Sequence, residues 1–492
     1  MFACAHNPAT GERTGRLMSE DEELALGKVS DQDILDNLRV LDDSQPLSVL
    51  VAAVGQEVAA QTERPDLPWT FRVLDDPAVN AFAVPGGYVY VTRGLLTHLN
   101  AKDELAAVLG HECGHIAARH GVIAMRAAQK KANAVAFLAG ALDPNRSHVA
   151  AVAARSARLK LLESDRAQEL EADELMLRYV AKTDHEPAAF LEVLGLLAQL
   201  DVESERVPSW LSTHPAPEQR QEHLAAKLGD VERAPAVDSE YLAAIDGVVH
   251  GPDPREGLLV DSTYVHGRVG FAFDLPAGWA LEGDRESVTA LAPDNLSQMG
   301  VAPKYYAYDT AEKATTAFFI SGIYLQGTTT EVDAVGTKML LTNFVLPTRM
   351  GDWVGLVGFV ALGDSVVAVM ASAPKVIWPQ HEQAVTAAFS SLRLLTPEQR
   401  LVLEPARIEI AELPPETSLR AFAGEEGAGR LDALARLNRL DPEQTSAQAR
   451  AIKTIRFPTP PEPVEPASPP PPASQRKGRK TGKGPKTVDP LG

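Results

Sequence analysis

The sequence predicts an α+β protein with three parts: a mainly helical N-terminal part with a small sheet, a strand-rich α+β domain, and a small C-terminal unit. Apolar residues such as Leu105, Val108 and Leu109 recur at helical spacing up to about residue 228. After Gly229, short apolar runs alternate with turn residues, as is typical of strands. The chain has 492 residues, enough for about three folded units.

The helical part begins at Ser19, which Glu22 follows at the spacing of a capping box. One stretch, TFRVLDDPAVNAFAVPGGYVYVTRG, interrupts the helical pattern with short apolar alternations. Asp75-Asp76-Pro77 and Pro85-Gly86-Gly87 break these alternations, so the stretch predicts a small sheet with a tight turn. We assign residues 18–230 to this first domain and residues 231–259 to a linker.

Residues 260–400 are predicted to form a separate α+β domain, whose role the sequence does not reveal. The runs WVGLVGFVAL and SVVAVMASA, joined at Gly363-Asp364, indicate a hairpin. A helical stretch from Gln380 to Leu392 follows them. No catalytic constellation is recognisable in this region.

The C-terminal part divides into two segments. Residues 404–457 are predicted to contain one strand, two short helices and a closing strand. Residues 458–492 are first proline-rich and then basic, which predicts a disordered spacer followed by a solvated tail.

Composition excludes several classes of protein. The chain carries 47 basic and 66 acidic residues, a net charge of −19 that would repel a nucleic-acid backbone, so no nucleic-acid partner is expected. Two cysteines cannot build a disulfide framework. No apolar run reaches the roughly 18 residues that a membrane-spanning helix needs.

The strongest chemical signal is LAAVLGHECGHIAARH, which contains His111, Glu112 and His115 as HExxH. On a helix, positions i and i+4 lie about 40° apart, so both imidazoles can reach one metal ion. Glu112, about 100° from His111, flanks the same place. Two neutral nitrogens and a neighbouring carboxylate are what hydrolytic zinc requires, namely ligands and a base for water.

A third metal ligand must come from elsewhere in the chain. A metzincin would have a histidine six residues after His115, but Gly121 occupies that place and His120 is one residue early. Glu169 and Asp173 are spaced i, i+4 in SDRAQELEADELMLRY. One of these carboxylates can therefore ligate the metal while the other accepts a ring N–H from a ligating histidine.

Four motifs now follow in order: NAFAVPGGYVYVTRGLL, HECGH, ELEAD and STHPAPEQR. Over residues 18–228 the chain resembles the HtpX-like and CAAX-prenyl-protease-like gluzincin metallopeptidases, in particular their soluble bacterial envelope branch. The resemblance implies a zincin-type peptidase fold with one Zn²⁺ per chain, held by His111, His115 and Glu169. It also implies that Glu112 is the general base and acid, and that Asp173 supports a ligand without binding the metal.

The family also has a His-Pro segment and a following arginine near its cleft, matched here by His214-Pro215 and Arg220. A protonated histidine or an arginine near the metal would stabilise the oxyanion. Alternatively, His214 would fill the open zinc position and shut the site. Asn80 and the NAFAVPGG strand are expected to form the sheet edge with which an extended substrate pairs.

Two further resemblances concern the ends of the chain. MFACAHNPATG, within residues 1–17, is similar to the region around the acylated cysteine of family lipoproteins, although no basic and apolar signal regions precede it. Cys4 is thus either a lipid anchor or an ordinary cysteine. Residues 408–457, with PPETSLRAFA and LARLNRL, resemble a degenerate LysM module, a glycan-binding fold, in which Pro415-Glu416 replaces the usual Gly-Asp.

The leading hypothesis is a zinc endopeptidase of the bacterial periplasm that acts on extended or misfolded envelope proteins. Unfolded proteins are then its main partners, with peptidoglycan or the membrane surface as further ones. The alternative is a chaperone-like or glycan-binding envelope scaffold with vestigial zinc chemistry. Glu112 argues against that alternative, because a scaffold has no need of a general base.

Overall fold

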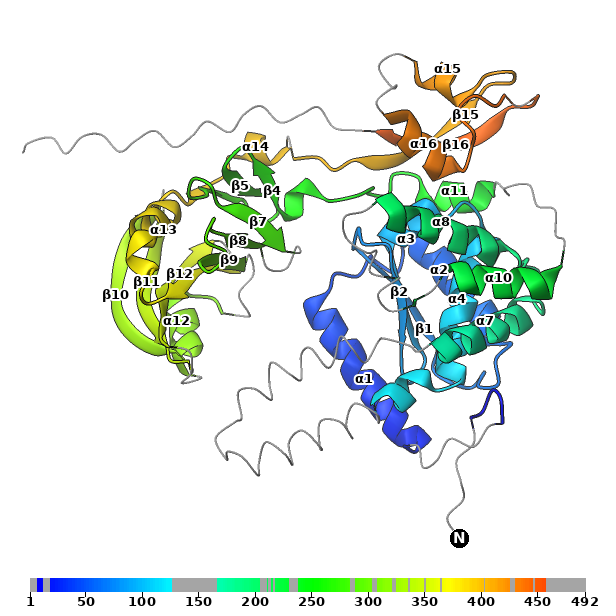
Figure 1. Ribbon diagram of the computed structural model, residues 1–492, viewed down its shortest axis with the longest axis horizontal. Helices are drawn as coiled ribbons and strands as arrows, with labels where there is room; N and C mark the ends of the chain where they lie inside the picture. The colour runs from blue at the N-terminus through cyan, green and yellow to red at the C-terminus, as the bar shows by residue number, and fades with distance from the viewer. Residues whose placement is uncertain are drawn as a thin grey trace, which may run out of the picture. The chain divides into compact units, whose positions relative to one another are not determined.

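The computed structural model resolves the chain into two compact units, one of residues 1–253 with 404–458, the other of residues 254–403 with 459–492 (Figure 1). The structure describes residues 7–11, 18–125, 166–203, 210, 214–215, 217–229, 238–283, 288–302, 308–320, 324–334, 337–348, 351–362, 365–401, 403–424, 430–445 and 447–456. Cys4 and the predicted proline-rich and basic tail lie outside these residues.

The first unit is mainly helical, as predicted. Its helices are α1 (Glu20–Asn37), α2 (Pro46–Ala59), α3 (Arg93–His98), α4 (Lys102–Ala117), α7 (Arg166–Val180), α8 (Ala189–Glu203), α10 (Pro217–Leu228), α11 (Ser239–Ile245), α15 (Leu419–Ala423) and α16 (Leu431–Asn438). Its strands are β1 (Thr70–Leu74), β2 (Ala81–Val84), β3 (Tyr88–Thr92), β15 (Arg407–Leu413) and β16 (Arg450–Arg456). Ser19 and Glu22 form the predicted capping box at the start of α1.

The predicted small sheet is present, with strand order β1-β3-β2. The central strand β3 is buried throughout. It pairs in parallel with β1 and antiparallel with β2. Gly86 and Gly87, with φ of 90° and 103°, make the tight turn between β2 and β3 in a conformation that favours glycine. A bridge from Val40 to Leu74 covers the free side of β1. Within the described ranges, β2 pairs with β3 alone and so forms an edge.

Helix α4 runs through the centre of the first unit and is buried from Glu104 to Ala117. It packs against α2, α7 and α8. Gly114 permits a close approach to α7, because a Cβ at this position would lie 3.0 Å from the Ala172 carbonyl oxygen and 3.2 Å from its Cα. This approach brings the two helices that carry HECGH and ELEAD side by side.

The second unit is strand-rich, as predicted. Its elements are η1 (Pro254–Glu256), β4 (Leu258–Val260), β5 (Thr263–His266), β6 (Phe271–Asp274), β7 (Ala280–Gly283), β8 (Val288–Leu291), β9 (Gln298–Ala302), α12 (Ala311–Ile320), β10 (Leu325–Ala334), β11 (Thr337–Leu346), β12 (Trp353–Leu362), β13 (Ser365–Pro374), η2 (Trp378–Gln380), α13 (Glu382–Ser390), β14 (Arg393–Leu394) and α14 (Pro397–Leu401). One sheet has the order β10-β11-β12-β13-β9-β8-β7 and the other β14-β6-β5-β4. β12 and β13 form the predicted hairpin, ending at the pair Leu362 and Ser365.

The segment resembling LysM has the predicted order of strand, two helices and strand, with β15 and β16 antiparallel. By its contacts it belongs to the first unit. Ile408 and Leu437 enter the same hydrophobic core as α4. Its likeness to a LysM module stays a prediction. Among the described residues, no helix is both long and apolar enough to cross a membrane.

Replacing Gly114 by valine should push α4 away from α7, because the added methyl groups meet rigid helix backbone. We expect a loss of about 1–3 kcal/mol in the free energy of unfolding of the first unit, measured by urea titration. Gly195→Val in α8 is the matched control, since a Cβ there meets only the Gln221 side chain at 3.5 Å. Equal losses in both variants would show that valine in a helix, and not the close approach, is responsible.

Candidate metal centre

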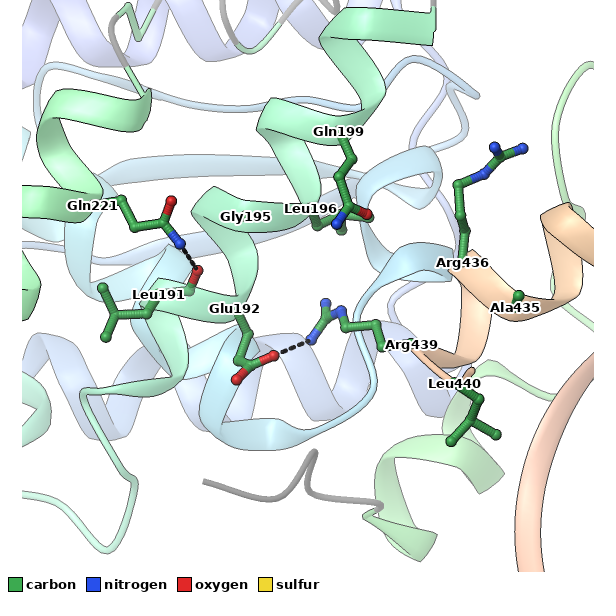
Figure 2. Close-up of a pocket in the computed structure, with 10 residues that line it drawn as sticks. All are labelled: Leu191, Glu192, Gly195, Leu196, Gln199, Gln221, Ala435, Arg436, Arg439 and Leu440. Atoms are coloured by element: carbon green, nitrogen blue, oxygen red, sulfur yellow. Dashed lines mark hydrogen bonds and ion pairs between the residues drawn. The ribbon is translucent and has the colours of Figure 1, made fainter. Parts of the chain in front are cut away.

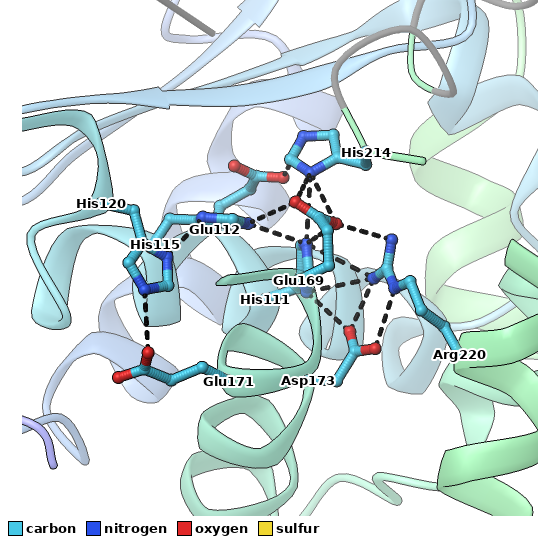
Figure 3. A network of polar contacts seen from close by, with 9 residues as sticks. All are labelled: His111, Glu112, His115, His120, Glu169, Glu171, Asp173, His214 and Arg220. Atoms are coloured by element: carbon cyan, nitrogen blue, oxygen red, sulfur yellow. Dashed lines mark hydrogen bonds and ion pairs between the residues drawn. The ribbon is translucent and has the colours of Figure 1, made fainter. Parts of the chain in front are cut away.

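Four side chains from three segments converge on one point: His111 and His115 from α4, Glu169 from α7, and His214 from the segment before α10. One ligand atom from each lies within 4.8 Å of all the others, and all four residues are buried. Figure 3 shows them pointing toward one another. Helical i, i+4 spacing accounts for the two α4 histidines, as the sequence predicted.

Four of the six separations between these atoms are close to those of a tetrahedral ligand set. His115 Nε2 lies 3.1 Å from His111 Nε2, and His111 Nε2 lies 3.3 Å from His214 Nδ1. Glu169 Oε1 lies 3.1 Å from His214 Nδ1 and 3.5 Å from His115 Nε2. Ligands about 2.0–2.1 Å from a tetrahedral metal ion are themselves about 3.3 Å apart. The donors, three imidazoles and a carboxylate, are also those that zinc takes in proteins.

Asp173, one helical turn beyond Glu169, orients one of the donors. Its Oδ1 lies 2.9 Å from His111 Nδ1, so the Nδ1–H of His111 can donate to it and leave the Nε2 lone pair for a metal. This contact is the one that the i, i+4 spacing on α7 predicted for one of the two carboxylates.

Arg220 on α10 lies behind the donors and is 1% exposed. Its Nε and Nη2 donate to the two Asp173 oxygens at 2.8 and 2.6 Å, and its Nη1 lies 2.8 Å from Glu169 Oε2. The guanidinium also lies 4.9 Å from the Trp210 ring centre and 5.6 Å from that of Phe190. These contacts hold both carboxylates in place, whereas contact with an oxyanion stays a prediction.

A second chain of contacts, which the sequence reasoning missed, supports His115. His120 Nδ1 lies 2.9 Å from His115 Nδ1, and His120 Nε2 lies 3.3 Å from Glu171 Oε2. Asn7 Nδ2 donates to Glu171 Oε1 at 2.7 Å. In the sequence, the only sign of this contact is that His120 follows His115 by five residues, a spacing that does not fit the metzincin pattern. Each α4 histidine of the donor set thus has a polar partner on its Nδ1.

Glu112 lies beside the donor set and is 1% exposed. Its Oε1 is 3.5 Å from His214 Nε2, and neither atom makes a hydrogen bond to the described residues. Burial raises the pKa of the Glu112 carboxyl above its ordinary value, although the charges of His214 and His111 act in the opposite direction. A carboxylate with a raised pKa and a free oxygen is suited to accept a proton.

The electrostatics of the cluster favour an added positive charge. Burial and the charge of Arg220 lower the pKa of His111, but hydrogen bonds to Asp173 and Glu169 outweigh them and raise it to about 9. Among the described residues of the cluster, three buried carboxylates, those of Glu112, Glu169 and Asp173, face one guanidinium, that of Arg220. With the histidines neutral, as metal ligands are, a divalent cation would balance the two remaining negative charges. The residues present therefore fit a metal ion.

The predicted substrate residue Asn80 lies just before the edge strand β2. Its backbone N–H donates to Thr92 Oγ1 and its carbonyl accepts the Thr92 N–H, both at 3.0 Å. The neighbouring Val79 carbonyl accepts the Trp210 N–H at 3.1 Å. Trp210 in turn stacks on the His214 ring at 4.7 Å between centres, so the start of β2 lies next to the His214 segment. Substrate binding by Asn80 stays a prediction.

A buried HExxH helix with a glutamate from a second helix and a general-base candidate beside them is the arrangement typical of metallopeptidase domains. Residues 49–228 match the model of peptidase family M48. The resemblance drawn from the four sequence motifs is thereby confirmed.

Several curated proteins are similar to this chain. A putative beta-barrel assembly-enhancing protease of Vibrio cholerae is 29% identical over 226 residues, 43% of this chain and 45% of that protein. The mitochondrial metalloendopeptidase OMA1 of Schizosaccharomyces pombe is 28% identical over 218 residues, covering 43% and 63%. The beta-barrel assembly-enhancing protease of Escherichia coli K12 is 25% identical over 220 residues, covering 43% and 45%. The chain spans about half the length of these relatives.

Replacing His120 by alanine should weaken metal binding, because His115 then loses the partner that holds its ring. Loss of such an outer partner typically costs about 10–100-fold in metal affinity. We expect a loss in this range, measured by zinc titration against a competing chelator. The control is His223→Ala, a histidine of α10 that contacts only the exposed Glu174 in the described part of the chain. Unchanged affinity in His120→Ala would mean that His115 is held without this chain of contacts.

Proposed function

We propose that this chain is a zinc-dependent endopeptidase that hydrolyses peptide bonds in extended or misfolded proteins of the bacterial envelope. The observation that carries the proposal is the buried cluster of three imidazoles and one carboxylate with Glu112 directly beside it. Acidic residues that only form a solvated surface are exposed, whereas the residues of this cluster are buried. A scaffold would not need Glu112 at this place.

In this proposal His111, His115 and Glu169 hold one zinc ion. When bound, zinc supplies Lewis acidity that polarises a carbonyl group and acidifies water. Asp173 and Arg220 act on the ligands: Asp173 fixes the His111 tautomer, and Arg220 orients both carboxylates. The family resemblance supports the same ligand set, and the donor spacing agrees with it.

Glu112 is proposed to move the proton. Its Oε1, which has no hydrogen bond to the described residues, accepts a proton from water. The same oxygen then returns the proton to the leaving amine. Burial, which raises the pKa of Glu112, brings the carboxyl nearer to the pH at which such an exchange is efficient.

His214 is proposed both to restrain and to assist the reaction. Its Nδ1 stands with the other three donor atoms, where it completes a closed set and leaves no open position. Turnover then requires the His214 segment to move away. Once displaced, the same imidazole can donate a hydrogen bond to the developing oxyanion.

An extended substrate is proposed to pair with the edge of β2, near Asn80. Strand addition of this kind uses main-chain hydrogen bonds and tolerates many sequences, which suits unfolded substrates. β2 packs beside α4, and the start of β2 adjoins the His214 segment through Val79 and Trp210. The names of the bacterial relatives, which refer to β-barrel assembly, support substrates in the envelope and a periplasmic location. A lipid anchor at Cys4 and contact with peptidoglycan or the membrane remain predictions from sequence resemblance.

Glu112→Gln should abolish most hydrolysis while zinc stays bound. Glutamine keeps the shape of the side chain but cannot accept the proton, so kcat on an unfolded protein should fall by about 10² or more. Zinc content is measured on the same preparation. Glu174→Gln, on the exposed face of α7, is the control and should behave as wild type. Near-normal turnover in Glu112→Gln would move the general base elsewhere.

His214→Ala should lower kcat by roughly 10²-fold with zinc retained, because the open form is the one that reacts and it loses a donor to the oxyanion. Turnover of one unfolded substrate is compared among wild type, His214→Ala and Arg220→Ala. A faster His214→Ala enzyme would mean that restraint by the closed set outweighs assistance. Unchanged rates in both variants would leave this segment without a part in catalysis.

A further inference from the structure

The C-terminal segment 404–456, here called the C-terminal module, contacts the start of the HExxH helix. It belongs to the first compact unit together with residues 1–253. A cavity of about 490 Å³ lies between α8, α10 and α16, lined among others by Leu191, Gln199 and Arg436. Figure 2 shows Arg439 reaching from the module across the wall of this cavity toward Glu192.

Arg439 forms a two-pronged ion pair with Glu104 on α4. Its Nη1 contacts Glu104 Oε1, and its Nη2 donates to Glu104 Oε2 at 3.0 Å. Glu104 is 4% exposed, so this pair is shielded from water. The same Oε2 accepts the backbone N–H of Asn100 at 2.8 Å. Since Ala101 at the N-cap of α4 has no side-chain bond to offer, Glu104 and its partners define how the helix begins.

Lys453 on β16 contacts the segment that leads into α4. Its Nζ, with the residue 0% exposed, donates to the carbonyls of Thr97 and Leu99 at 2.8 and 2.9 Å. Both carbonyls stand at the C-terminal end of α3, where helix carbonyls lack partners within the helix. Burial lowers the pKa of the Lys453 ammonium well below its ordinary value, and the Glu104 charge acts in the opposite direction.

Inside the module, Asn438, the residue that precedes Arg439, is linked to the backbone of Lys453. Lys453 N–H donates to Asn438 Oδ1 at 2.7 Å, and Asn438 Nδ2 donates to the Lys453 carbonyl at 2.8 Å. Arg439, the next residue, caps α16 with φ of 50°. Glycine is the usual residue in this left-handed position. An arginine thus stands at a backbone site that favours glycine, which points to a role for its side chain.

We propose that Arg439 and Lys453 are positioning residues, through which the C-terminal module sets the start of α4 and thereby the orientation of its metal-binding face. His111 follows Glu104 by seven residues, about two helical turns along one rigid rod. A tilt or rotation at the start of α4 would thus displace the donor atoms. The activity part of the proposal rests on the proposed peptidase function, whereas its structural part does not.

The test uses Arg439→Gly in the full chain, because glycine removes the side chain while relieving the left-handed backbone. We expect faster hydrogen exchange of the first α4 amides, an affinity for zinc about tenfold lower, and a kcat about tenfold lower with KM within twofold. Arg439→Lys, which keeps the charge but not the two-pronged contact, should fall between. If the glycine variant fails to fold, the lysine variant decides by the same readouts.

Arg420→Ala is the control, an exposed arginine of the same module that pairs with Glu443. It should match wild type in every readout. A folded Arg439→Gly protein with wild-type exchange in α4 and wild-type zinc affinity would overturn the positioning role. If the wild-type protein cleaves nothing, the proposed function fails, but exchange and zinc affinity still decide on Arg439. If the wild-type protein also binds no zinc, hydrogen exchange of the first α4 amides alone decides whether Arg439 positions the helix.

Discussion

The first unit depends on one electrostatic constraint: in the part of the chain that the structure describes, three carboxylates are buried together and one guanidinium opposes them. Glu112, Glu169 and Asp173 are each at most 1% exposed, and Arg220 is equally buried. Burying an unbalanced charge is costly, so such a centre is stable only when a cation, a proton or a metal ion completes it. The pKa of His111 is raised for the same reason, because the neighbouring carboxylates stabilise the protonated imidazole.

Packing in the rest of the first unit keeps the buried charged side chains close to one another. The absence of a side chain at Gly114 lets α4 and α7 approach, which carries Glu169 to the two histidines. Trp210 and Phe190 enclose the guanidinium of Arg220, and Trp210 also stacks on His214. In the proposed function, the same closeness makes His214 a fourth donor and leaves Glu112 as the group free to take a proton.

Local spacing predicted the parts of the site that lie on single helices. His111 and His115 on one helix, and Glu169 and Asp173 on another, follow from the i, i+4 geometry. The small sheet and the β12–β13 hairpin were predictable because glycine, proline and aspartate mark their turns. His214 and Arg220 came only from a motif resemblance, since no periodicity connects a loop to a helix 45 residues away.

Contacts between distant segments could not be predicted. The pair of Arg439 and Glu104 joins positions 335 apart, and Asn7 meets Glu171 across 164. Such pairs leave no trace in composition or spacing, because only the folded chain brings them together. The inclusion of residues 404–458 in the first unit likewise depends on tertiary contacts.

We infer that the buried acidic cluster holds a divalent metal ion. The most direct measurement is elemental analysis of the purified chain after equilibration with zinc and dialysis, beside Glu169→Gln. We expect one zinc ion per wild-type chain and a loss of most of it in the variant, because the donor set then lacks the Glu169 carboxylate. A wild-type chain without bound metal, or a variant with undiminished zinc, would contradict this inference.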